Sequence, residues 1–199
     1  MTPAEAEAKE PGATYIVIDA VRATTTIAAL FHRGLRRLRV VGTRRGTALA
    51  GRGDVILFGE EGGLRPAGFD YGNSPAEAAA LDWRAVRRSW SLPTGRRRFA
   101  RWPAWATVAA GALVNLTALA DLAGTHGRVV VVCAGNAGAR TFALEDFAVG
   151  ACLVAAPATA APGCPAGRRG TARHRDEGPG TSHHSVGACG RDAPPAVRP

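Results

Sequence analysis

Tyr15-Ile-Val-Ile-Asp-Ala-Val-Arg-Ala-Thr-Thr-Thr-Ile-Ala-Ala-Leu30 sets the architecture that the rest of this chain follows. Its first four residues are apolar and mostly β-branched or aromatic, which predicts a buried strand. Asp19 stands at the carboxyl end of that strand, where open α/β sheets place their ligands. Arg22 and three consecutive threonines then lead into an Ala/Leu-rich helix.

Two interpretations of this stretch are open. A carboxylate, a guanidinium and a helix N-terminus within eight residues could bind a metal ion and an anion together. Alternatively, Asp19 only closes a turn, and one of the threonines only caps the helix.

The rest of the pattern predicts a layered fold. Strands are predicted at residues 37–41, 55–58, 107–114 and 128–133, and helices at 75–81, 116–123 and 142–154. Such strand–loop–helix repeats predict an α/β fold with three layers, α/β/α, around a central sheet that is largely parallel or mixed. Regular patterning is absent from residues 84–105. Residues 155–199 hold almost no large apolar side chains, so we expect an α/β domain at 1–154 followed by a disordered tail at 155–199.

The positive charge of the chain is confined to two segments. The formal net charge is +9, of which residues 84–105 contribute +7 and residues 155–199 contribute +3, so the remainder carries −1. A nucleic-acid-binding domain would spread basic residues over a folded face. No apolar run approaches the roughly 18 residues of a membrane-spanning helix, and residues 1–12 lack a signal-peptide apolar core. We therefore expect a cytoplasmic protein with neither nucleic acid nor membrane as its partner.

Five carboxylates follow predicted strands or begin the next helix; they are Asp19, Glu60, Glu61, Glu145 and Asp146. Because the carboxyl ends of parallel strands converge, several of them could share one metal ion, and Mg²⁺ prefers oxygen ligands. The alternatives are that Glu145 and Asp146 only complement the helix dipole and that Glu60 and Glu61 are solvated turn residues.

Other polar residues have two interpretations each. Arg22 could hold a phosphate or a sulfonate through two parallel hydrogen bonds, or form a surface ion pair. Asn73 could bind a ligand. Ser74 could do so too, but a capping box explains it fully, with Pro75 at the first helical position and Glu77 reciprocating. Asn115 lies at the end of a predicted strand and could also contact a ligand.

Four blocks of sequence occur in a recognisable order. They are Val17-Ile-Asp-Ala-Val-Arg-Ala-Thr-Thr-Thr26; Gly59-Glu-Glu-Gly-Gly-Leu64 with Gly68-Phe-Asp-Tyr-Gly-Asn-Ser-Pro75; Gly111-Ala-Leu-Val-Asn115; and Cys133-Ala-Gly135 with Leu144-Glu-Asp-Phe147. In this order and spacing they resemble the 2-phosphosulfolactate phosphatase family over about residues 15–154, with an interruption at 84–105.

The resemblance implies a phosphatase-like domain at 1–154 and an enzyme, a Mg²⁺-dependent phosphoric monoester hydrolase. Its substrate would be a small phosphorylated, sulfonated acid, cleaved to sulfolactate and phosphate in coenzyme M biosynthesis. The candidate catalytic residues are Asp19, Arg22 and Asn115. The candidate substrate-binding residues are Thr24, Thr25, Thr26, Asn73, Ser74 and Gly135. The candidate metal ligands are Asp19, Glu60, Glu61, Glu145 and Asp146. The oligomeric state stays open, with a homodimer as one alternative.

One block of the family is missing. Members carry a strand ending in a Thr-Asn-Gly-Thr loop between the Asn-Ser-Pro helix and the Gly-Ala-Leu-Val-Asn strand, where this chain reads Ser89-Trp-Ser-Leu-Pro-Thr-Gly-Arg-Arg-Arg98. One possible coding of that segment, TCG TGG TCC CTA CCA ACG GGA CGG CGG CGT, gives Val-Val-Val-Pro-Thr-Asn-Gly-Thr-Ala-Ala when it is read one base earlier. Our hypothesis is that about residues 84–105 are translated out of frame, and that the tail after 155 has the same origin. The chain would then be an inactive or weakened form of the enzyme.

The alternative function is nucleic-acid binding through the Arg/Trp-rich segment 84–105. Arginines and aromatic side chains together could follow a phosphate backbone and stack on bases.

Overall fold

The fold is seen in a computed structural model, which describes residues 12–41, 48–52, 55–86, 89–92, 107–136, 141–156 and 186–187. The predicted tail beyond residue 156, apart from Val186–Gly187, lies outside these residues. So does most of the segment 84–105. In the part of the chain that the structure describes, none of the helices has the length and apolar character that crossing a bilayer requires.

The main sheet has four parallel strands around β1 (Thr14–Ile18). β5 (Thr107–Gly111) and β6 (Val129–Cys133) pair with its two edges, and β7 (Val186–Gly187) pairs with β5, giving the order β6-β1-β5-β7. All five residues of β1 are buried, as expected for a central parallel strand covered on both faces. The strand predicted from the opening stretch is therefore confirmed. The β7 strand, within the predicted tail, was not foreseen.

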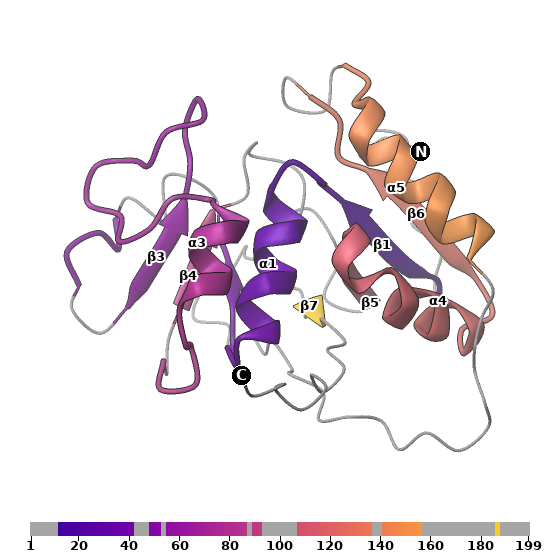
Figure 1. The fold of residues 1–199 in the computed structure, drawn as a ribbon, viewed down its shortest axis with the longest axis horizontal. Helices are drawn as coiled ribbons and strands as arrows, with labels where there is room; N and C mark the ends of the chain where they lie inside the picture. The colour runs from indigo at the N-terminus through magenta and orange to yellow at the C-terminus, as the bar shows by residue number, and fades with distance from the viewer. Residues whose placement is uncertain are drawn as a thin grey trace, which may run out of the picture.

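Helices cover both faces of this sheet (Figure 1). On one face, Tyr15 and Val17 of β1 share a buried cluster with Ile27 and Leu30 of α1 (Ala23–His32). On the other face, Ile16 and Ile18 lie in a second cluster with residues of α4 (Leu116–Gly124) and α5 (Leu144–Ala155), namely Leu119, Ala120, Val149 and Leu153. Alternate residues of a strand point to opposite faces, so this division confirms the predicted three-layer α/β/α arrangement.

A second sheet lies on the other side of α1 (Figure 1). It contains β2 (Arg39–Val40), β4 (Ser89–Leu92) and β3 (Ile56–Gly59), all parallel, in the order β2-β4-β3. The sequence did not indicate that the strands divide between two sheets. The prediction of irregular structure at 84–105 is wrong for Ser89–Leu92, because these residues form the central strand of the second sheet.

An aromatic cluster joins the second sheet to α3 (Pro75–Ala80). Phe58 of β3 stacks on Tyr71 with ring centroids 5.2 Å apart, and both rings meet Trp83 edge-on. Trp83 is 2% exposed, and its indole N–H donates to the Ala78 carbonyl at 2.7 Å. This tryptophan therefore belongs to the folded core and not to the arginine-rich segment that follows it.

Several boundaries differ from the predicted ones. The strand at β5 ends at Gly111 because Leu113–Asn115 form a 3-10 turn, η2, before α4. Helix α1 ends at His32, where Gly34 adopts a φ of 97° and the Leu35 N–H returns to the Leu30 carbonyl. Glycine adopts this left-handed conformation readily, which explains the stop.

The register of the main sheet places three strand ends in one row. Ile18, the last residue of β1, pairs with Gly111 of β5 and with Cys133 of β6. The residues that follow these three therefore leave the sheet side by side, and the Ala134 N–H donates to the Ile18 carbonyl at 2.7 Å. Asp19 is the residue that leaves β1 at this edge.

We predict that Gly111→Ala destabilises the fold, because an added Cβ would lie 2.9 Å from Ile16 Cγ2 and 2.9 Å from Ile18 Cγ1. Such overpacking lowers the free energy of unfolding by about 1 to 3 kcal/mol. Urea unfolding measures it, with Gly127→Ala as the control, since an added Cβ there meets nothing within 4 Å. Equal urea midpoints for the two variants would contradict this packing.

We also predict that replacing Ser89–Arg98 by Val-Val-Val-Pro-Thr-Asn-Gly-Thr-Ala-Ala stabilises the chain. Central parallel strands favour β-branched residues, so the free energy of unfolding should rise by on the order of 1 kcal/mol or more. The control changes only Arg96, Arg97 and Arg98 to Thr, Ala and Ala, which leaves β4 as it is. A replacement no more stable than this control would count against the out-of-frame hypothesis.

Candidate functional site

The turn after β1 is held by the residue that the sequence placed at its centre. Asp19 is 2% exposed, and its Oδ1 accepts from the Ala23 N–H at 3.4 Å. Its backbone is fixed by Thr24, because the Asp19 N–H donates to Thr24 Oγ1 at 3.0 Å and that hydroxyl donates to the Asp19 carbonyl at 2.8 Å. The Asp19 carboxylate therefore sits in a turn of defined shape at the start of α1.

The three threonine hydroxyls all donate to backbone carbonyls. Thr24 donates to Asp19 and Thr25 to Ala20 at 2.7 Å, whereas Thr26 shares its proton between Arg22 at 2.9 Å and Asn73 at 3.2 Å. None of them caps the helix, since Arg22 is the N-cap residue and no side chain caps α1; the capping alternative is therefore wrong. A hydroxyl has one proton to donate, so in this structure the threonines shape the turn. Their predicted contact with substrate stays a prediction.

Asp146 connects the turn after β1 to the loop after β6. It is 3% exposed and lies in the first turn of α5. Its Oδ1 accepts from the Ala20 N–H at 2.8 Å, and its Oδ2 accepts from the Gly135 N–H at 2.9 Å. Gly135 has a φ of 68°, a conformation that favours glycine. The two loops are thus held together by one carboxylate.

The pKa of Asp146 is raised above its ordinary value of 3.8, chiefly because burial disfavours the charged form. The two backbone hydrogen bonds lower this pKa, and the neighbouring charges of Asp19 and Glu145 raise it again. Because Asp146 accepts from Ala20, the residue next to Asp19, the two aspartates lie at the same edge of the sheet. The sequence-based expectation that strand ends bring distant acids together holds for this pair.

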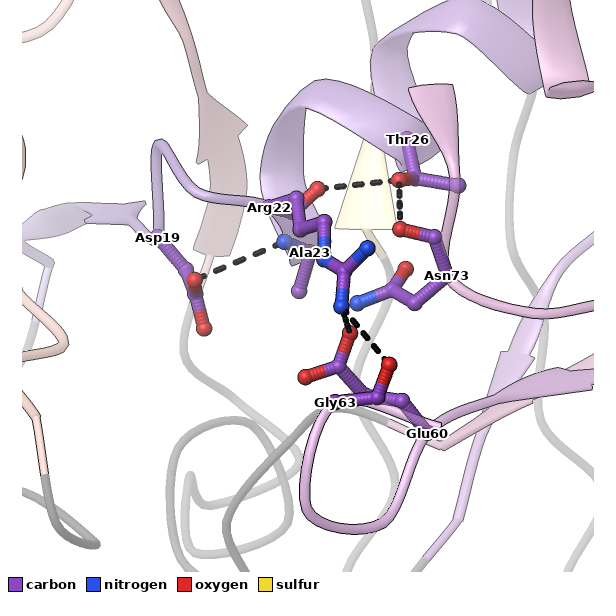
Figure 2. Close-up of polar contacts among 7 residues, drawn as sticks. All are labelled: Asp19, Arg22, Ala23, Thr26, Glu60, Gly63 and Asn73. Atoms are coloured by element: carbon purple, nitrogen blue, oxygen red, sulfur yellow. Dashed lines mark hydrogen bonds and ion pairs between the residues drawn. The ribbon is translucent and has the colours of Figure 1, made fainter. Parts of the chain in front are cut away.

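Arg22 reaches from the start of α1 to the loop after β3 (Figure 2). Its Nη2 lies 2.8 Å from Glu60 Oε2, an ion-pair contact without good hydrogen-bond alignment, and donates to the Gly63 carbonyl at 3.1 Å. The Glu60 side chain is 12% exposed and that of Arg22 is 35% exposed. The ion pair that the sequence left open as an alternative for Arg22 is therefore present, and it joins the two sheets. No sequence pattern indicated that the Ala20 N–H and the Gly63 carbonyl belong to the site, because the positions of these backbone groups depend on loop conformation alone.

Asn73 and Ser74 lie at the start of α3. Asn73 is 4% exposed, and its carbonyl accepts from Thr26 Oγ1 at 3.2 Å. Its side-chain nitrogen, Nδ2, has no hydrogen-bond partner. Ser74 is the N-cap of α3, with its Oγ accepting from the Glu77 N–H at 3.3 Å. The capping explanation for Ser74 is confirmed, and its contact with substrate stays a prediction.

Asn115 holds the turn after β5. Its Oδ1 accepts from the Ala112 N–H at 2.9 Å, and its Nδ2 donates to the Ala110 carbonyl at 3.0 Å. Both functional groups of the amide thus stabilise the path of the chain. The structure shows a positioning role, and the predicted catalytic role is not tested by it.

The five acids do not form one cluster. Among the described residues, no three His, Cys, Asp or Glu side chains are grouped as a metal site would require. Glu60 pairs with Arg22, whereas Glu61 is exposed in a tight turn closed by Leu64. Asp19 and Asp146 remain as a pair of buried carboxylates, which fits a Mg²⁺ ion that takes one or two carboxylates and completes its shell with phosphate and water.

Comparisons with known proteins agree with these motifs. A family model described as 2-phosphosulpholactate phosphatase matches residues 1–162. A "Probable 2-phosphosulfolactate phosphatase" of Thermosynechococcus vestitus is 34% identical over 143 residues, which cover 70% of this chain and 59% of that protein. Proteins of the same name from Deinococcus radiodurans and Thermotoga petrophila are 39% and 30% identical, over 62% and 71% of this chain. The chain spans 53 to 61% of the length of these three relatives.

We predict that Asp19→Asn lowers the pKa of Asp146, because it removes a negative charge that now raises it. Carboxyl carbon shifts followed by NMR during a pH titration measure this pKa, with Asp82→Asn, an exposed and Arg84-paired aspartate, as the control. An Asp146 pKa unmoved by Asp19→Asn would contradict the pairing.

The same raised pKa has a consequence for stability. Between 3.8 and the raised value, the folded chain retains a proton that the unfolded chain releases. The contribution of Asp146 to the free energy of unfolding is therefore greatest below pH 3.8 and decreases as the pH rises through the raised pKa.

Proposed function

Because the chain belongs to the 2-phosphosulfolactate phosphatase family, we propose that it hydrolyses 2-phosphosulfolactate to sulfolactate and inorganic phosphate. The match over residues 1–162 and the names of the relatives support this proposal. The observation that carries it is the buried pair of carboxylates, Asp19 and Asp146, fixed where β1 and β6 end.

Two carboxylates repel a phosphate dianion, so the proposed reaction needs a compensating cation. We propose Mg²⁺, with Asp19 as its principal ligand and Asp146 beside it. The ion would neutralise charge on the phosphoryl oxygens. The chemistry of the donor set supports this choice, since both groups offer only oxygen atoms, which Mg²⁺ favours.

The other residues of the site have distinct proposed roles. Helix α1 begins at Ala23, four residues after Asp19, and the dipole at its N-terminus favours an anion there. Arg22, the N-cap residue, adds a guanidinium that can bind an oxyanion. Thr24 and Asn115 hold the turns after β1 and β5, so we assign them the positioning of this site.

Three further expectations are proposals of the same kind. They are a cytoplasmic location, assembly as a homodimer, and reduced activity of this chain because the Thr-Asn-Gly-Thr loop of the family is missing. We do not propose nucleic-acid binding. Neither the family match nor the names of the relatives support it, and the side chains of Trp90, Trp102 and Trp105 in that segment lie outside the described residues.

We predict that phosphate release from 2-phosphosulfolactate requires Mg²⁺ and that Asp19→Asn lowers kcat by on the order of a hundredfold or more. A lost electrostatic stabiliser has an effect of this size. A phosphate-release assay with Mg²⁺ or EDTA measures it, both for this chain and for the variant with the replaced 89–98 segment. The control is Asp82→Asn, which removes an exposed carboxylate and should leave kcat unchanged.

Full activity of Asp19→Asn would remove this residue from the mechanism. Undiminished activity in EDTA would remove the metal.

A further inference from the structure

Two groups of hydrogen-bond donors beside the start of α1 are not used by the fold. Asn73 Nδ2 is buried and has no acceptor. The guanidinium of Arg22 contacts Glu60 and the Gly63 carbonyl through the same nitrogen, Nη2. Within the described residues, Nε and Nη1 of Arg22 have no partner. Figure 2 shows the Asn73 amide turned toward the Arg22 guanidinium.

This arrangement lacks an acceptor. Two donor groups cannot satisfy each other, and a buried donor without an acceptor carries the full penalty of its desolvation. A group with several oxygen atoms between Arg22 and Asn73 would satisfy both. Because one donor is a guanidinium and the site adjoins the N-terminus of a ten-residue helix, the favoured group is an anion.

Glu60 engages one of the three nitrogens of the guanidinium. Its carboxylate contacts Nη2, so it fixes the orientation of Arg22 and leaves the N–H groups of Nε and Nη1 unused among the described residues. These two nitrogens face different sides of the guanidinium, and each can donate a charge-assisted hydrogen bond to a carboxylate or a sulfonate. Glu60 lowers the net positive charge here. It also orders the Arg22 side chain in advance, so that binding an anion costs less conformational entropy.

The backbone of Asn73 is also held in place. Its carbonyl accepts from Thr26 Oγ1 of α1, and the next residue, Ser74, caps α3. The backbone that carries the amide is therefore fixed between two helix N-termini before any ligand arrives.

This second pair of residues is separate from the aspartate pair. Figure 2 shows Asp19 on one side of the start of α1 and Arg22 with Asn73 on the other. The substrate of the proposed reaction carries three anionic groups, namely the phosphate ester, a carboxylate and a sulfonate. We propose that Arg22 and Asn73 form a second anion site that binds an acid group of the substrate other than its phosphate, while the phosphate lies at Asp19. This inference rests on the proposed function.

The test compares three esters. They are 2-phosphosulfolactate, 2-phospholactate, which lacks the sulfonate, and 1-sulfopropan-2-yl phosphate, which lacks the carboxylate. Asn73→Ala should lower kcat/KM for the full substrate by about tenfold, mainly through KM, as expected for a lost hydrogen bond to a charged group. For the ester that lacks the bound acid group, Asn73→Ala should leave kcat/KM unchanged. If hydrolysis of 2-phospholactate is the unchanged reaction, the bound group is the sulfonate. If hydrolysis of 1-sulfopropan-2-yl phosphate is unchanged, the bound group is the carboxylate.

Two controls separate binding from folding. Trp83→Phe removes the hydrogen bond to the Ala78 carbonyl and should lower the urea midpoint while leaving the ratio of kcat/KM between the esters unchanged. Asn73→Asp keeps the shape but places a carboxylate at the site, so it should weaken binding of the same group more than Asn73→Ala does. If Asn73→Ala fails to fold, Asn73→Asp and Arg22→Lys provide the comparison.

Binding of 3-sulfolactate, which carries no phosphate, gives a readout that needs no catalysis. Calorimetry should show a Kd about tenfold higher for Asn73→Ala than for the unchanged chain. An equal loss on all three esters, or an unchanged Kd, would overturn the second anion site. If the unchanged chain hydrolyses none of the esters but binds 3-sulfolactate through Asn73, the second anion site stands and the proposed function fails.

Discussion

One carboxylate, that of Asp146, determines how the loops of the candidate site meet. The register of the sheet brings the ends of β1 and β6 into one row, but it does not fix the loops beyond them. Asp146 fixes them, because its two oxygens accept from Ala20 after β1 and from Gly135 after β6. Hydrogen bonds to a charged group contribute about 1.5 to 3 kcal/mol each. Burial of the charge opposes this gain and raises the pKa of Asp146. The site therefore retains a carboxylate whose charge is costly, which is the condition under which a cation adds the most stability.

The layered fold could be predicted because its determinants are local. β1 is an apolar β-branched run, and α3 begins with a serine cap followed by proline, so each is recognisable within a few residues. The division into two sheets depends on which strands pair across the chain, and a pattern of period two does not encode a partner. β4 was missed because Ser-Trp-Ser-Leu is only four residues long and lacks the β-branched content of a central strand, although its polar and apolar residues alternate. Its pairing with both β2 and β3 comes from its neighbours.

The site could be predicted only in part, because the sequence indicates where a residue lies in the fold but not which atoms its side chain contacts. Position follows from topology, so the convergence of Asp19 and Asp146 was foreseen. Contact depends on loop conformation, which directs the hydroxyl of Thr25 to a carbonyl and both ends of the Asn115 amide to the backbone. A polar residue near a strand end is thus a candidate for binding until the hydrogen bonds of the surrounding turn are known. Asn73 is the informative exception, because its backbone is fully placed while its side-chain donor has no partner.

The ion pair between Arg22 and Glu60 makes the proposed chemistry depend on the second sheet. Glu60 follows β3 directly. In the described part of the chain β4 is the neighbouring strand of β3 in the sheet, and the other side of β3 bonds only to the short segment Asp70–Tyr71. A weak β4 would therefore loosen β3, then Glu60, and finally the guanidinium that Glu60 orients at the start of α1. The Asp19–Asp146 pair lies at the main sheet and does not share this dependence. If residues 84–105 are out of frame, the loss should fall on the Arg22 side of the site first, where it would weaken substrate binding before it disturbs the carboxylates. The altered segment would then lower the affinity for substrate, because β4 supports β3, β3 positions Glu60, and Glu60 orients Arg22.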